Sequence, residues 1–185
     1  PLKDSIEIQV QSEKQPPIIT SQVKPPFSDK SLFVGNFDSE IEQELLATDN
    51  NGTIYLMGLN INGLQRKWVY PFAIDADTGV YNGHLGTQIA PIETTATDSK
   101  KEILVNQDGV LFIIDDLGQK PREILRFDSR IEAMETADLN GDGIDEIILG
   151  VNANNGSHLY VYRFGSFDLP LYIGEFDHIK SIAVG

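Results

Sequence analysis

The sequence predicts an all-β protein built from repeated four-stranded units. Short apolar runs alternate with polar turn residues, and no segment of useful length shows the period of about 3.6 residues that marks a helix. One order of features recurs three times: strand, acidic residue, loop, acidic residue, strand, Asn-Gly or Asp-Gly pair, strand. Recurrence of one supersecondary unit at intervals of this size indicates a repeat architecture.

Residues 1–30 carry no motif of their own. Two short apolar or alternating runs, at residues 6–10 and 18–23, are separated by one Pro-Pro pair and followed by another. Because proline cannot donate a hydrogen bond to a sheet, we expect edge strands or an extended linker from a preceding unit here.

The first unit is predicted over residues 31–74 and the second over residues 91–128. In each, an apolar run leads into an Asn-Gly or Asp-Gly pair and a second apolar run follows. Such a pair is the strongest short-range signal of a β-hairpin, because type I′ turns need positive φ angles. Residues 75–90 between the two units are polar and rich in glycine, and we expect a loop insertion there.

The third unit is predicted over residues 129–178, and residues 179–185 are predicted to begin another. The last five residues, Ser-Ile-Ala-Val-Gly, match the Ser-Leu-Phe-Val-Gly of residues 31–35, which open the first unit. Fourth strands complete the three units, at residues 67–74, 122–127 and 169–176.

The chain is acidic and contains no cysteine. It has 28 acidic and 14 basic residues among 185, a formal net charge of −14. This charge disfavours nucleic acids and anionic membranes as partners, because neither would gain electrostatic attraction, and it suits a protein that binds cations. Disulfides and thiolate metal sites are excluded. No apolar run is long enough for insertion into a membrane.

The most informative stretch runs from Asp138 to Glu146. Asp138, Asn140 and Asp142 place an oxygen-bearing side chain at every second position, a glycine follows, and Glu146 opens an apolar run. Alternating oxygen ligands with a glycine at the bend suit a hard cation such as calcium. An EF-hand is disfavoured, because its twelfth position would be Leu149 and a strand follows the loop. The alternative is an acidic turn that binds no metal.

The loop resembles that of FG-GAP (VCBS) repeats, the four-stranded blades of integrin-α-like β-propellers. The resemblance implies about three such blades, with partial blades at both ends, as part of a larger propeller. It also implies a structural Ca2+ held between the first two strands of a blade. The implied ligands are Asp138, Asn140, Asp142, the backbone carbonyl of Ile144, and Glu146.

Three blades and two fragments do not make the usual ring, because radial propellers close with about four to eight blades. The chain is either a segment of a longer propeller or closes on itself, with residues 179–184 joining strands from residues 5–23 in a fourth blade. We favour the first, because the unpaired edges of an isolated three-blade piece would invite self-association.

The corresponding loop of the first unit is a weaker candidate for a metal site. Asp38, Glu40, Glu42 and Glu44 form an acidic run that lacks a glycine at its bend. Both a weak metal site and a solvated acidic hairpin fit this pattern.

The loop of the second unit is predicted to be free of metal. It runs only from Asp98 to Glu102, and it contains Lys100 and Lys101. Two lysines beside the loop would repel a cation.

The sequence shows no nucleophile elbow, phosphate-binding glycine loop or histidine–carboxylate triad. We therefore expect a non-catalytic calcium-binding module, not an enzyme, that mediates adhesion through a protein or glycan partner outside the cell or at its surface. Self-association and the remaining blades of the same propeller are further expected contacts. The alternatives are part of a polysaccharide-acting enzyme or lectin propeller, and an intracellular scaffold subunit with similar blades.

Overall fold

The computed structural model describes residues 27–38, 40, 42–49, 52–61, 63–71, 87–97 and 100–184, with backbone alone at 27–31 and 169. Within these residues the protein is all-β, with three sheets of four antiparallel strands and no helix. The predicted fold class is therefore confirmed at the level of repeated four-stranded sheets. The predictions for residues 1–26 and for most of the insertion at 75–90 lie outside the described residues.

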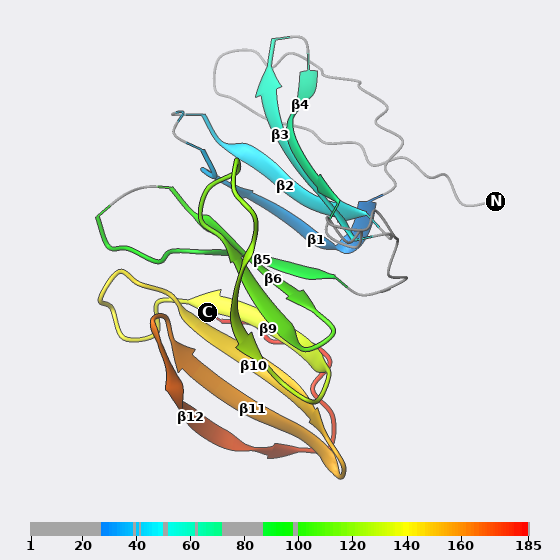
Figure 1. Cartoon of the computed structure of the whole chain (residues 1–185), viewed down its shortest axis with the longest axis vertical. Helices are drawn as coiled ribbons and strands as arrows, with labels where there is room; N and C mark the ends of the chain where they lie inside the picture. The colour runs from blue at the N-terminus through cyan, green and yellow to red at the C-terminus, as the bar shows by residue number, and fades with distance from the viewer. Residues whose placement is uncertain are drawn as a thin grey trace, which may run out of the picture.

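The sheets follow one another along the chain, and in each the strands lie in sequence order (Figure 1). The first contains β1 (Phe27–Gly35), β2 (Glu44–Asp49), β3 (Thr53–Asn60) and β4 (Gly63–Pro71). The second contains β5 (Gln88–Ile92), β6 (Glu102–Gln107), β7 (Val110–Ile114) and β8 (Arg122–Arg126). The third contains β9 (Ile131–Ala137), β10 (Glu146–Ala153), β11 (Gly156–Arg163) and β12 (Ser166–Phe176).

The strand bounds differ from the predicted units at three places. β1 begins at Phe27, inside the segment predicted as a linker, and β5 begins at Gln88, inside the predicted insertion. Residues 179–184, predicted as the first strand of a following unit, form no strand ladder. They instead lie against the third sheet, with the Ile179 side chain packed over Gly150. A strand requires a hydrogen-bonded neighbour, and among the described strands none pairs with residues 179–184.

The three predicted hairpins form, but with different turns. Asp108 and Gly109 have φ angles of 50° and 85°, which is the type I′ turn predicted from the Asp-Gly pair. Gly109 must also be small, because a Cβ there would lie 2.5 Å from the carbonyl oxygen of Ser129. In the third hairpin Ala153 pairs with Gly156, so the two-residue loop is Asn154-Asn155 and the glycine belongs to the strand.

The core consists of two apolar layers, one on each side of the second sheet. Alternation along β6 explains this arrangement, because Ile103 and Val105 face the first sheet while Leu104 between them faces the third. The layer between the first and second sheets contains Phe37, Leu46, Ile54, Leu56, Ile89, Ile103, Val105 and Ile114. The layer between the second and third sheets contains Ile92, Leu104, Leu111, Ile113, Ile131, Ile147, Leu149, Val151 and Tyr162.

The two outer faces of this arrangement remain partly open. Val34 on β1 is 65% exposed and pairs with half-buried Leu45 on β2. On the far side, Ile148, Val161 and Leu171 form a cross-strand row on the face of the third sheet that points away from the second, and Leu171 is 63% exposed. The end sheets thus present apolar side chains at positions that the middle sheet buries.

The same pair of positions connects neighbouring sheets at both junctions. Lys101 N donates to Asn36 O across 2.7 Å, and Asp145 N donates to Glu93 O across 2.8 Å. In each case the donor is the residue just before the second strand of one sheet, and the acceptor is the residue just after the first strand of the preceding sheet. The sheets are therefore related by a repeated contact as well as by a repeated sequence.

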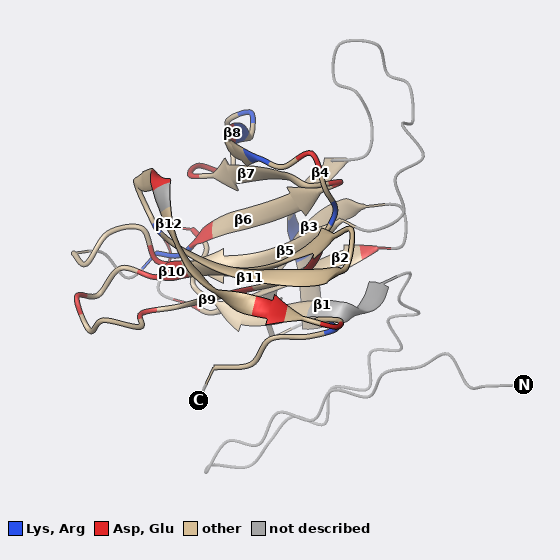
Figure 2. Ribbon diagram, turned by 90° about the horizontal axis from the view of Figure 1, so that it is seen from below, with Lys and Arg blue, Asp and Glu red and all other residues tan. Residues whose placement is uncertain are grey.

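Charged residues lie mainly in the loops and at the strand ends, where Figure 2 shows acidic residues in red against largely uncharged strands. Within the described residues, acidic side chains are therefore concentrated at the edges of the sheets. In the described part of the chain, no helix is long and apolar enough to span a membrane.

Candidate metal centre in the loops between first and second strands

Each sheet begins its second strand with a buried glutamate. Glu44, Glu102 and Glu146 are only 1%, 7% and 6% exposed. Each is opposite the last residue of the preceding strand, namely Gly35, Ile92 or Ala137. The three side chains are therefore equivalent in both register and burial.

The shared role of these glutamates is to accept a backbone N–H from the loop that precedes them. Glu44 accepts from Phe37 N at 2.9 Å, and Glu146 accepts from Leu139 N at 2.9 Å. Glu102 accepts from both the backbone N (3.3 Å) and the hydroxyl (2.8 Å) of Thr94. The sequence places two of these glutamates, Glu44 and Glu146, in candidate metal loops. The recurrence of one residue type at one strand position was the available sign that they also hold the loop backbone.

In the first loop, three carboxylates surround a lysine. The oxygen atoms of Asp38, Glu40 and Glu44 lie within 4.8 Å of one another, a spacing at which they could hold a metal ion, and nothing in the grouping selects calcium. Lys67 Nζ bonds to all three, at 2.9, 2.6 and 2.9 Å respectively. Glu42, the remaining residue of the predicted weak site, is exposed and does not belong to this group.

The electrostatics of this group favour the charged forms of Lys67 and Asp38. The Glu40 carboxylate raises the pKa of Lys67 well above its ordinary value; burial of the ammonium opposes this effect, and Glu44 and Asp38 add to it. Burial alone would raise the pKa of Asp38, but the N–H of Glu40 and the Lys67 ammonium outweigh it and lower that pKa.

The second loop uses its lysines elsewhere. Lys100 Nζ donates to the carbonyl oxygen of Asp115, 2.7 Å away, and Lys101 Nζ lies 3.8 Å from the Asp145 carboxylate of the third sheet. Asp98, the first acid of this loop, lies outside the described residues. The prediction that this loop binds no metal remains a prediction.

The third loop folds around the carboxylate of Asp138. Its Oδ1 accepts the N–H groups of Gly141 (2.7 Å) and Asp142 (3.1 Å), and its Oδ2 accepts that of Gly143 (2.8 Å). Gly141 and Gly143 have φ angles of 79° and 84°, which allow this tight wrap. Asn140 contributes twice, accepting from Asp142 N and donating to Glu146 Oε1.

The predicted ligands of this loop are neighbours, but their carboxylates are not drawn together. Among the described residues, the group of three acidic side chains with oxygens within 4.8 Å of one another is that of the first loop. Asp142 Oδ2 instead bonds Arg163 of β11 at 2.8 Å. Arg163 was not identified from the sequence, and neither was Lys67, because each reaches its loop across paired strands.

Hydrogen bonds within the loop acidify Asp138. The N–H of Gly143 is the main cause, burial opposes it, and the N–H groups of Gly141 and Asp142 add to it, so the pKa of Asp138 falls below its ordinary value. Asp138 is therefore ionised at neutral pH, as a hard-cation ligand must be.

Asp145 has a different function from the other acids of the third loop. Its backbone N–H donates to Glu93 O, and its Oδ2 accepts the Glu93 N–H at 2.8 Å. This buried side chain fastens the third sheet to the second and is not available to the loop.

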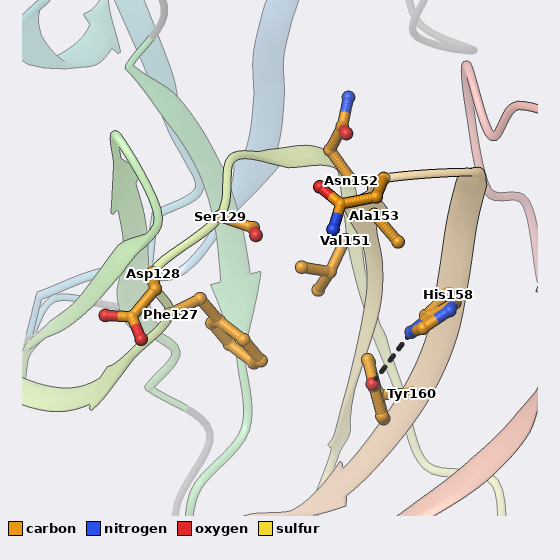
Figure 3. A pocket seen from close by; sticks show the side chains of 9 residues that line it. Phe127, Asp128, Ser129, Val151, Asn152, Ala153, His158 and Tyr160 are labelled. Atoms are coloured by element: carbon orange, nitrogen blue, oxygen red, sulfur yellow. Dashed lines mark hydrogen bonds between the residues drawn. The ribbon is translucent and has the colours of Figure 1, made fainter.

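A shallow pocket of about 280 Å³ lies beside the third sheet, between residues 127–129, residues 151–154 and the start of β11 (Figure 3). His158 Nδ1 and the Tyr160 hydroxyl lie 3.1 Å apart there and hydrogen-bond each other. Asp128 is the one carboxylate in its lining, so the pocket holds no pair of acids for glycoside chemistry.

Comparisons with protein-family models, with curated proteins and with solved structures find no match for this chain. The assignment of its function therefore rests on the residues and on the geometry described above.

Proposed function

We propose that this chain is a run of three blades from a larger β-propeller, of the FG-GAP type that the third loop resembles, and that it is a non-catalytic binding module stiffened by calcium. The blades serve as a rigid support for loops that contact a protein or glycan partner outside the cell. The observation that carries the calcium assignment is the buried Glu146 carboxylate.

In the described part of the chain, Glu146 forms no ion pair like the one that its equivalent in the first sheet forms. The described groups that donate to its oxygens are Leu139 N and Asn140 Nδ2, whereas Glu44 bonds the ammonium of Lys67. Within the described residues no lysine or arginine forms an ion pair with Glu146. A buried carboxylate is costly unless it is paired with a cation, and a divalent ion bound in this loop would supply one.

The donor set of the third loop fits calcium in its chemistry. Asp138, Asn140, Asp142 and Glu146 supply hard oxygen atoms, and the carbonyl of Ile144 supplies another. The Asp142 carboxylate is turned toward β11, where it accepts a hydrogen bond from Arg163. To bind the ion it must give up this ion pair. The bound ion would neutralise the loop and hold the first two strands of the sheet together.

The assignment to a larger propeller is supported by equivalent positions in the three sheets. Leu46, Leu104 and Ile148 each lie two residues after the buried glutamate that begins the second strand of their sheet. Leu46 packs against the second sheet and Leu104 against the third, each on the face toward the sheet that follows. Ile148 lies on the same face of the third sheet, where it is only 5% exposed and Ile179 packs over neighbouring Gly150. Leu171, in the same cross-strand row, is 63% exposed and is a position that a further blade would cover.

Thermal unfolding with calcium and with a chelator tests the metal. We expect saturating calcium to raise the melting temperature by about 3 to 6 °C, the shift produced by ligand at roughly ten times its Kd in a chain of this size. Asp142→Asn should abolish the rise. Asp168→Asn, which removes the same charge from an exposed position on β12, should retain it.

Two results would contradict the assignment of the site. No calcium-dependent shift in the wild-type chain would exclude a structural calcium ion. A shift that persists in full in Asp142→Asn would show that the ion binds elsewhere.

A further inference from the structure

The acidic group of the first loop already surrounds a cation, and this cation is the side-chain ammonium of Lys67. Lys67 Nζ lies within 2.6 to 2.9 Å of the carboxylates of Asp38, Glu40 and Glu44. These are the three groups that could otherwise share a metal ion. The ammonium thus stands at the point toward which all three converge.

The fold provides a path for the lysine to reach this point. Lys67 extends from β4, an edge strand of the sheet. Glu44 begins β2, on the far side of β3, and Asp38 and Glu40 lie in the loop that precedes it. Gly58 of β3, which pairs with Glu44, leaves the space that the lysine stem crosses. A Cβ at Gly58 would lie 2.6 Å from Lys67 Cε and 3.2 Å from Cδ.

The charges of the group require a cation. Asp38, Glu40 and Glu44 carry three negative charges within a few ångströms, and the Glu44 side chain is 0% exposed. Without Lys67 the buried carboxylate would lose its counter-ion and face two like charges. Any replacement must therefore bring positive charge to the same place.

We propose that Lys67 is a tethered counter-ion that takes the place of a metal in the first loop, so that this loop is independent of divalent cations. Removal of the ammonium exposes a site for a hard divalent cation with carboxylate ligands from Asp38, Glu40 and Glu44. The inference does not depend on calcium binding in the third loop.

The test uses the full chain in an Asp142→Asn background, so that the third loop contributes nothing. In this background, Lys67→Met removes the charge and keeps most of the apolar stem, while Arg66→Met removes a charge from the adjacent residue of the same strand. The probe is Ca2+ alone, and the measurements are thermal unfolding with calcium and with chelator, and calorimetric titration.

We expect Lys67→Met to melt lower in chelator and to recover on addition of calcium. It should bind one ion in the weak range of about 0.1 to 1 mM that is known for extracellular calcium modules. The background chain and Arg66→Met should respond to neither calcium nor chelator. If the stability of Lys67→Met also responds to neither calcium nor chelator, the proposal is overturned.

If Lys67→Met fails to fold, two further measurements still test the proposal. Gly58→Val fills the path of the lysine stem with a branched side chain, at a strand position whose φ angle permits it, so it should confer calcium dependence while leaving Lys67 in the chain. In the background chain, the 15N resonance of the Lys67 ammonium should not move when calcium is added. Displacement of the ammonium by calcium, or a folded Gly58→Val chain whose stability does not respond to calcium, would overturn the proposal.

Discussion

At the scale of single residues, one position in three sheets shows how a buried carboxylate can be stabilised in different ways. Glu44 pairs with an ammonium, and Glu102 takes the N–H and hydroxyl of one threonine. Glu146 has only an N–H and an amide in the described chain. Burying a carboxylate carries the same kind of cost in each sheet, and a different group offsets that cost in each one.

The lowered pKa of Asp138 predicts a pH dependence of stability. A carboxyl whose pKa is lower in the folded state contributes its full stabilisation above the ordinary value of 3.8, and loses it as the pH falls through the lowered pKa. Asp138→Asn should therefore be less stable than wild type at neutral pH, and the difference should shrink toward about pH 2. Urea unfolding midpoints, measured in chelator across this range, check the prediction. A difference that is constant with pH would contradict it.

At the scale of elements, the strands and hairpins are set locally and could be predicted from sequence. The Asp108-Gly109 pair specifies its own turn, because both residues accept positive φ. The third hairpin differs because Gly156 pairs within the ladder and lies against the carbonyl of Phe176 on β12. This contact joins two neighbouring strands, so the Asn-Gly pair alone does not predict it.

Alanine substitutions at two turn glycines distinguish the cost of a left-handed backbone from the cost of a steric clash. Gly109 and Gly165 have φ angles of 85° and 78°, but a Cβ at Gly165 would meet nothing within 4 Å. We expect Gly165→Ala to cost about 1 to 2 kcal/mol of unfolding free energy from the left-handed backbone alone. Gly109→Ala should cost about 1 to 3 kcal/mol more, because Ser129 O must move. Chemical denaturation of both variants checks this, and equal losses would contradict the role of the close contact.

At the scale of the whole molecule, and within the described residues, the second sheet packs against another sheet on both faces and each end sheet on one, while Ile179 covers part of the outer face of the third sheet. Two apolar layers result, and the outer faces present Val34 on one side and Leu171 on the other. Exposed apolar sheet faces promote association, because burying them removes apolar surface from water.

We therefore expect the isolated chain to self-associate through its end faces. The double variant Val34→Lys, Leu171→Lys should weaken association by roughly tenfold or more, since each lysine would have to be buried at the contact. Ile61→Lys is the control, because Ile61 is 99% exposed in the β3–β4 turn and belongs to neither face. Sedimentation velocity over a concentration series measures the effect. Association that is unchanged in the double variant, or lost equally in the control, would contradict this account.

The sequence by itself determined the all-β class, the repeated four-stranded unit and the Asp108-Gly109 turn, because alternation and turn chemistry act over a few neighbouring residues. It also singled out the loops at Asp38 and Asp138. Only the tertiary structure decided which charge compensates which loop. Lys67 is separated from Glu44 by 23 positions and Arg163 from Asp142 by 21. Their meeting depends on strand register and on the space left at Gly58, which exist only once the sheets have formed.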